Sequence, residues 1–151
     1  PLIRNLNFTK IEIEKKVERA LDMVLLADSI NKMPSDLSGG MRKRVGLARS
    51  IITEPSLMLY DEPTTGLDPI TTKEISQLIR DLQAELKMTS IVVTHDLICA
   101  RIISDDVIVL KEGKIRYKGS LTELNESKDS FLINFFSAEF VEENKGEIDG
   151  K

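Results

Sequence analysis

Hydrophobic residues recur at two different spacings along the chain. Three stretches with steps of three and four residues predict helices: residues 11–27, 38–53 and 69–86. The second of these should end at Glu54-Pro55, because a residue before proline avoids the helical conformation. The expected apolar faces are Ile13, Val17, Ala20, Leu21, Val24 and Leu25; then Met41, Val45, Ala48 and Ile52; then Ile75, Leu78, Ile79, Leu82 and Leu86.

Short, almost wholly apolar runs alternate with these helices and predict strands. Such runs are typical of strands that are buried in a parallel sheet. The expected strands are Ser56–Tyr60, Thr89–Thr94 and Val107–Leu110, and Glu112-Gly113 should turn the last of them into a hairpin with Lys114–Lys118. Shorter helices are expected at Leu97–Ile103, Leu121–Glu126 and Ser130–Ala138. This alternation predicts an α/β domain with parallel core strands.

Polar residues follow two of the predicted strands directly. Asp61 and Glu62 end the first, and His95 and Asp96 end the second. Ligands of parallel sheets bind at the carboxyl ends of the strands. We therefore expect these two clusters to form one site.

Composition narrows the function without naming it. The 151 residues are 41% hydrophobic and 30% charged, with a net charge of −4 and a pI of about 5.2. An acidic chain of this kind is not expected to bind nucleic acid. No apolar run approaches the roughly 20 residues that span a bilayer. The single cysteine, Cys99, suits a reducing compartment.

The first cluster has the chemistry of a cation and phosphate site. Asp61 would hold Mg²⁺, which favours one or two carboxylates together with phosphates and waters. Glu62 would then face the γ-phosphate of a nucleotide and polarise the attacking water. The alternative is that the two carboxylates cap a turn.

Other polar positions fit the same ligand. Ser38 is a good N-cap, and Gly39 and Gly40 would let a phosphate approach the positive end of the helix. His95, the only histidine, could donate to a phosphate oxygen or orient Glu62. Asp68 should cap the helix that begins at Pro69.

Taken together, these segments resemble the nucleotide-binding domain of ABC ATPases. Leu37–Met41 is similar to the family's signature, Leu57–Asp61 to its Walker B strand, and Gly66–Asp68 to its D-loop. The resemblance implies that Glu62 is the catalytic glutamate and His95 the switch histidine. It also implies that Asp68 lies at a dimer interface.

The family resemblance implies cofactors, partners and a location. The cofactors would be ATP and Mg²⁺. The partners would be a second ATPase subunit in a head-to-tail dimer, whose ATP contacts Ser38–Gly40, and integral-membrane permease subunits. The subunit would be cytoplasmic and peripheral on the inner face of the membrane. Residues flanking the signature, Met33–Asp36 and Met41–Arg44, together with Thr65–Ile70, resemble bacterial Mla-type ATPases, which implies transport of phospholipids or other hydrophobic molecules.

The sequence lacks two segments that the family uses. No G-x-x-x-x-G-K-[ST] phosphate-binding loop occurs, and neither Gln77 nor Gln83 suits the Q-loop. The chain also opens with Pro1. We therefore expect a partial P-loop NTPase domain without its P-loop strand, which in the family lies between the strands ending at Thr94 and beginning at Val107. Such a chain alone should be inactive, and poorly stable or oligomeric.

The expected organisation follows from these assignments. Residues 1–119 would be the C-terminal part of the ATPase domain, with a helical subdomain over about 11–53 and the core over about 54–119. Residues 120–151 would be a helical extension with an acidic tail. The basic run Arg42–Arg44 is expected on a solvated helix face, with contact to phosphate or the membrane subunit as the alternative. A non-transport ABC ATPase, or a module that only binds a partner subunit, remain alternatives for the function.

Overall fold

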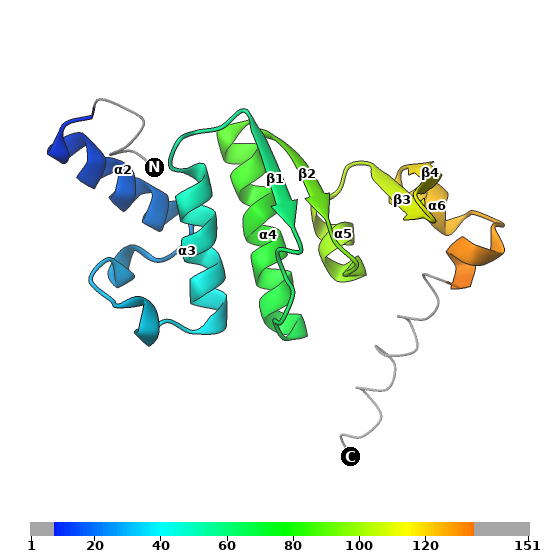
Figure 1. Cartoon of the computed structure of the whole chain (residues 1–151), viewed down its shortest axis with the longest axis horizontal. Coiled ribbons are helices and arrows are strands. Elements are labelled where there is room, and N and C mark those ends of the chain that lie inside the picture. The colour runs from blue at the N-terminus through cyan, green and yellow to red at the C-terminus, as the bar shows by residue number, and fades with distance from the viewer. Residues whose placement is uncertain (1–7, 135–151) are drawn as a thin grey trace, which may run out of the picture. The chain divides into compact units, whose positions relative to one another are not determined.

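A computed structural model describes residues 8–134 of the chain (Figure 1). The chain divides into two compact units, Pro1–His95 and Asp96–Lys151. The first contains, in order, α2 (Lys10–Met23), η1 (Ala27–Ser29), η2 (Pro34–Asp36), α3 (Gly39–Ile51), β1 (Leu57–Asp61), α4 (Pro69–Leu86) and β2 (Thr89–Val93). The second contains α5 (Leu97–Ile103), β3 (Val107–Lys111), β4 (Lys114–Gly119) and α6 (Leu121–Asn125). The predicted boundary between residues 119 and 120 stays a prediction.

Local sequence signals explain where the helices begin. Thr9 and Glu12 form a reciprocal capping box at the start of α2. Ser38 caps α3, and Asp68 caps α4 with Pro69 at its first position, as the sequence predicted. Caps of this kind satisfy amides that have no partner within the helix.

Strands β1 and β2 form a parallel pair, which confirms the expected α/β arrangement. Leu57 pairs with Thr89, and the register continues to Asp61 opposite Val93. The interior of this unit is built from side chains of helices and one face of β1. Its buried members include Val24, Leu26, Leu47, Ala48, Ile51, Met58, Tyr60, Ile75, Leu78, Ile79 and Leu82.

Two predicted helix faces need correction. Leu25 is 74% exposed and has a left-handed backbone, with φ of 59°, while its neighbour Leu26 is buried. Helix α2 ends at Met23, so the helical period no longer applies at Leu25. On α3 the buried residues are Leu47, Ala48 and Ile51 rather than the predicted stripe through Val45. Because α3 contacts both α2 and α4, its buried face lies between them.

The β1–β2 pair is covered on one side only within the described residues. Met58 and Tyr60 are buried, whereas Leu57, Leu59, Ile91 and Val93 are exposed large hydrophobic residues. Leu59 lies opposite Ile91, so these side chains form one apolar face, hereafter the open sheet face. Parallel sheets in α/β proteins are normally buried on both faces. The prediction of fully buried strands is therefore wrong for this face.

The second unit is a hairpin with short helices. Strands β3 and β4 are antiparallel and irregular at Val109 and Leu110, and the turn residues Glu112 and Gly113 both have positive φ. Side chains of α5, α6 and the hairpin share a small apolar cluster: Leu97, Leu124, Val107, Val109, Tyr117 and Leu121. Among residues 8–134, β2 pairs only with β1 and β3 only with β4, as expected without a strand between them.

The C-terminal segment is tied to the hairpin as far as it is described. Arg116 forms an ion pair with Asp129, and the Lys111 ammonium lies 4.1 Å from the centre of the Phe131 ring. Residues 130–134 are helical. The rest of the helix that was predicted to reach Ala138, and the acidic tail, lie outside the described residues.

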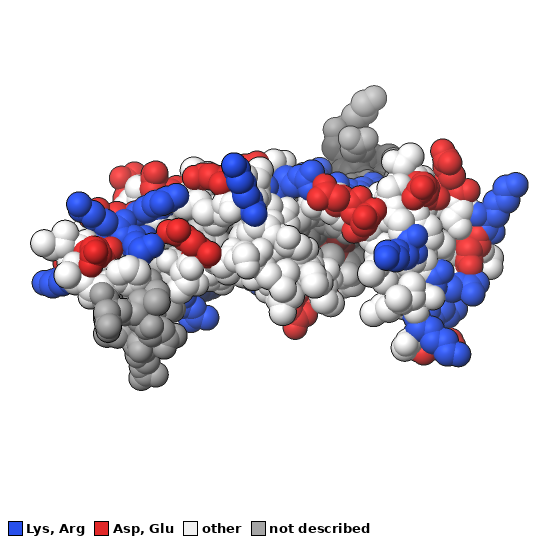
Figure 2. Space-filling view, turned by 90° about the horizontal axis from the view of Figure 1, so that it is seen from above, with Lys and Arg blue, Asp and Glu red and all other residues white. Residues whose placement is uncertain are grey.

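The described part of the chain has charged side chains of both signs on its surface. On the face drawn in Figure 2, basic and acidic side chains are interspersed. Within residues 8–134, no helix is both long enough and apolar enough to cross a bilayer.

The open sheet face predicts that the purified chain self-associates. Covering apolar surface is worth about 25 cal/mol per Å². Sedimentation velocity should show species larger than a monomer, and Leu59→Lys should shift them toward monomer. Ile70→Lys is the matched control, since Ile70 is equally apolar and 73% exposed but lies on α4. A monodisperse wild-type monomer with a cooperative melt would contradict the prediction.

Candidate functional site

The pairing of β1 with β2 brings the polar residues at their ends together. Asp61 is the last residue of β1 and lies opposite Val93, the last residue of β2. One residue on, the Glu62 amide donates to the Val93 carbonyl at 2.9 Å. The hydrogen bonding between the two segments thus continues one residue past β1 and fixes the position of the Glu62 backbone.

Glu62 and His95 meet across this end of the sheet. The His95 Nδ1 atom lies 2.9 Å from the Glu62 Oε1 atom, and the Thr65 hydroxyl donates to Oε2 at 3.1 Å. Glu62 has a φ of 48°, in the left-handed region that few non-glycine residues occupy. Both carboxylate oxygens are therefore held, by residues from different segments. We call Glu62, Thr65 and His95 the carboxylate–imidazole cluster.

The surroundings of Glu62 favour its charged form. The hydrogen bond from His95 is the main cause that lowers the pKa of the Glu62 carboxyl; burial acts against it to a lesser degree, and the bond from Thr65 lowers the pKa further. A carboxylate with a lowered pKa is a weak proton acceptor but a good hydrogen-bond acceptor. The site therefore suits orienting and polarising a water more than removing its proton.

Asp61 offers a hard oxygen ligand beside this cluster. Its side chain is exposed at the end of β1, directly before Glu62. In the described part of the chain, no group of three or more histidine, cysteine or acidic side chains is arranged to hold a metal ion. Mg²⁺ needs only one or two carboxylates when phosphates and waters complete its shell, so Asp61 fits that donor set.

The signature segment lies at the start of α3, as predicted. The Ser38 Oγ atom accepts from the Met41 amide at 3.2 Å. Gly40 packs closely on α4, because a Cβ atom at this position would lie 3.0 Å from the Thr71 side chain. A larger residue at Gly40 would therefore push the two helix starts apart.

Asp68 is committed to the start of α4. One carboxylate oxygen accepts from the amides of Ile70 and Thr71, both at 3.0 Å, and the other accepts from the Thr71 hydroxyl. That hydroxyl is the main cause that lowers the pKa of Asp68. Any contact of Asp68 with another subunit would use its remaining lone pairs.

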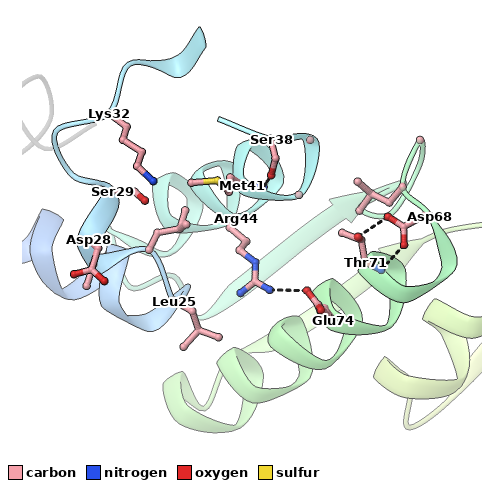
Figure 3. Close-up of a pocket in the computed structure, with 16 residues that line it drawn as sticks. Leu25, Asp28, Ser29, Lys32, Ser38, Met41, Arg44, Asp68, Thr71 and Glu74 are labelled. Atoms are coloured by element: carbon pink, nitrogen blue, oxygen red, sulfur yellow. Dashed lines mark hydrogen bonds and ion pairs between the residues drawn. The ribbon is translucent and has the colours of Figure 1, made fainter. Parts of the chain in front are cut away.

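The starts of α3 and α4 border one open pocket, the signature pocket, of about 970 Å³ (Figure 3). Ser38, Gly39, Gly40 and Asp68 line it together, so the structure unites four of the predicted site residues. The lining residues are Leu25, Leu26, Ala27, Asp28, Ser29, Lys32, Ser38, Gly39, Gly40, Met41, Arg44, Gly66, Leu67, Asp68, Thr71 and Glu74. Asp61, Glu62 and His95 are not among them and form a separate group.

Sequence reasoning missed two contributors. Thr65 was given no contact with Glu62, although a hydroxyl three residues after Glu62 in a turn is placed to reach it. Arg44 was expected on a solvated face, but only 16% of its side chain is exposed, and it pairs with Glu74. The Arg42 guanidinium also turns back, to donate to the Leu37 carbonyl at 2.6 Å. Neither arginine contact could be read from the helical period.

Comparison with known proteins shows what the chain is similar to. Residues 2–65 match the family model described as "ABC transporter". The chain is 44% identical over 111 residues to the methionine import ATP-binding protein MetN of Rhodopseudomonas palustris, covering 74% of the chain and 30% of that protein. It is 42% identical over 134 residues to the probable amino-acid ABC transporter ATP-binding protein y4tH of Sinorhizobium fredii, covering 88% of the chain and 52% of that protein.

A solved structure agrees with these relatives. The cbiO1 protein of Clostridium perfringens, part of the ABC transporter complex cbiONQ, superposes with a TM-score of 0.76 at 36% identity. The match covers 82% of this chain and 49% of that one. The described residues therefore have the α/β fold of an ABC ATPase. More particularly, the sequence matches part of the ATP-binding proteins of ABC transporters, and the chain spans between about a third and about half of the proteins it matches.

The narrower resemblance to Mla-type ATPases is not supported. The relatives that match are described as importers of methionine, amino acids or, for PotA of Ureaplasma parvum at 36% identity, spermidine and putrescine. The flanking residues that suggested a lipid transporter, Met33–Asp36 and Met41–Arg44, lie at η2 and on the first turns of α3. Arg42 donates to the Leu37 carbonyl and Arg44 pairs with Glu74, so these two residues make contacts within the fold. The residues of η2 are exposed, and none of these positions identifies a substrate.

The carboxylate–imidazole cluster predicts an ordered change in the pKa of Glu62. His95→Ala should raise this pKa toward its ordinary value, and Thr65→Val should raise it less, because the His95 bond is the larger cause. A lowered pKa stabilises the fold above the ordinary value, and that stabilisation is lost as pH falls through the lowered one. Carboxyl ¹³C NMR titration measures both variants. No change in His95→Ala, or a larger change in Thr65→Val, would contradict the assignment.

Proposed function

We propose that the chain forms part of the ATPase subunit of an ABC importer. This part would orient the attacking water and contact the nucleotide of the partner subunit. The carboxylate–imidazole cluster is the observation that carries this proposal, because Glu62 is held on both oxygens at the end of the sheet where parallel folds bind ligands. Glu62 would polarise the water that attacks the γ-phosphate, and His95 would keep the carboxylate charged and aligned. Catalysis of this kind consists mainly of positioning.

The exposed Asp61 carboxylate supports a role as Mg²⁺ ligand at this site. When bound, Mg²⁺ would offset part of the negative charge of the ATP triphosphate, whose terminal phosphate is the group that water attacks. The residues that contact most of the phosphates would have to come from a phosphate-binding loop. The 151 residues contain no such loop, so hydrolysis requires one elsewhere in the subunit or complex.

The signature pocket supports the second half of the proposal. The unpaired amides at the start of α3 and the bare backbone of Gly39 and Gly40 suit a phosphate that comes from outside this chain. In a head-to-tail dimer, Ser38–Gly40 would contact the partner's ATP. Asp68, on the pocket's other wall, would lie at the dimer interface.

Coupling to membrane permease subunits completes the proposal. The relatives named for methionine, amino-acid and polyamine import support a small polar solute as the substrate, in place of a lipid. The subunit would act at the cytoplasmic face of the membrane, bound to its permeases.

Glu62→Gln tests the catalytic assignment in the natural gene product, assembled as it occurs in the cell. Turnover of ATP should fall about 100-fold or more, since one preorganised charged group is worth that much, while ATP binding persists. Glu112→Gln is the matched control, because Glu112 has the same residue type and a φ of 51° in the β3–β4 turn. Steady-state hydrolysis and nucleotide binding are the measurements. Undiminished turnover in Glu62→Gln would remove Glu62 from this role.

Disruption of the gene should reveal the substrate class. Uptake of labelled methionine, other amino acids or spermidine should fall in the disrupted strain, because import of one of them would lose its energy source. Phospholipid movement between membranes should stay unchanged. The opposite pattern, with lipid movement lost and all three uptakes intact, would contradict import of a small polar solute.

A further inference from the structure

Arg44 joins three elements of the first unit from a largely buried position. Its Nη2 atom lies 3.1 Å from the Glu74 Oε2 atom on α4, and its Nη1 donates to the Val24 carbonyl at 3.4 Å. Val24 is the C-cap residue of α2, directly after Met23. Figure 3 shows the guanidinium reaching from α3 toward Glu74 across the signature pocket.

These contacts continue a row of cross-helix contacts that begins at the signature. A Cβ atom at Gly39 would meet the Leu67 side chain at 4.0 Å, and Gly40 approaches Thr71 more closely still. Arg44 follows Gly40 by four residues on α3, and Glu74 follows Thr71 by three on α4. Residues at these spacings share a helix face, so the ion pair lies one turn beyond the glycine contact.

The glycine contacts limit how close the two helix starts can come but cannot pull them together. The ion pair supplies that attraction. Exposed ion pairs contribute little, and the Glu74 side chain is 56% exposed. The Arg44 side chain, however, is only 16% exposed, and its fork also reaches a helix C-terminal carbonyl, where positive charge is favoured. Lysine at position 44 could not make both bonds with one planar group.

We propose that Arg44 is a positioning residue, which holds Ser38–Gly40 at a fixed spacing from Asp68 by tying α3 to Glu74 and to the end of α2. The role rests on the function proposed above, in which both segments face one nucleotide. In this role the Arg44 guanidinium is engaged by Glu74 and the Val24 carbonyl and sets the width of the signature pocket. Breaking the tie lets the pocket widen while the rest of the unit keeps its structure.

Hydrogen exchange on the full 151-residue chain tests the tie without any enzyme activity. In Arg44→Met and in the milder Arg44→Lys, exchange should be at least about fivefold faster at the hydrogen-bonded amides beside the pocket, with β1 and β2 unchanged. These amides are Leu37, Met41, Leu67, Ile70 and Thr71. Arg49→Met is the matched control, because Arg49 is an exposed arginine on the same helix. Unchanged exchange in both Arg44 variants, or equally faster exchange across the whole unit, would overturn the proposal.

Kinetics of the natural gene product test the consequence for catalysis. Arg44→Lys should lower kcat about tenfold and change the KM for ATP less than about twofold. The reason is that the residues lining the pocket would be displaced, while all of them remain present. Arg44→Met/Glu74→Met should be no slower than Arg44→Met alone, since the second change removes nothing further. Losses that multiply would overturn the proposal. A wild-type protein that does not hydrolyse ATP would instead refute the proposed function, and the exchange experiment would still decide the tie.

Discussion

The register of one parallel strand pair determines where the candidate catalytic groups lie. Because Asp61 pairs with Val93, the Glu62 amide reaches the Val93 carbonyl, and His95 then arrives beside the Glu62 carboxylate. A slip of β1 by one residue would turn every side chain of β1 to the opposite face and separate the pair. The buried side chains of Met58 and Tyr60 oppose such a slip, since it would expose them. Core packing and site geometry thus depend on the same pairing.

The junction between α3 and α4 has a comparable role for the signature pocket. Small residues allow close approach at the helix starts, and the Asp68 carboxylate organises the first turn of α4. The glycine contacts are steric, whereas Asp68 satisfies amides that have no partner within the helix, as Thr9 and Ser38 do at their own helices. The carboxylate–imidazole cluster and the signature pocket belong to the same compact unit, yet they share no lining residue. This separation agrees with the proposal that the cluster acts on the chain's own nucleotide and the pocket contacts the partner's nucleotide.

The sequence predicted most elements because their signals are local. Pro69–Leu86 and Leu97–Ile103 have the observed bounds, and the carboxylates and histidine at the strand ends could be expected to meet. The roles assigned to these residues in ATP hydrolysis stay predictions. Local signals could not show that Leu26 rather than Leu25 is buried, because a single left-handed residue breaks the helical period there. They also could not reveal the contact between Arg44 and Glu74, which are thirty positions apart. Flanking residues misled the substrate assignment, since Arg42 and Arg44 make contacts within the fold and the residues of η2 lie at the surface.

The left-handed backbone at Glu62 restricts how this position can change over evolution. Asn, Asp and Gly adopt such a conformation most readily, whereas valine or isoleucine would be strained in it regardless of their polarity. Substitutions at position 62 that keep this backbone conformation are therefore mainly to short polar residues or glycine. A descendant that had lost its chemistry would still carry a recognisable turn after β1, so the shape of the site would outlast its activity.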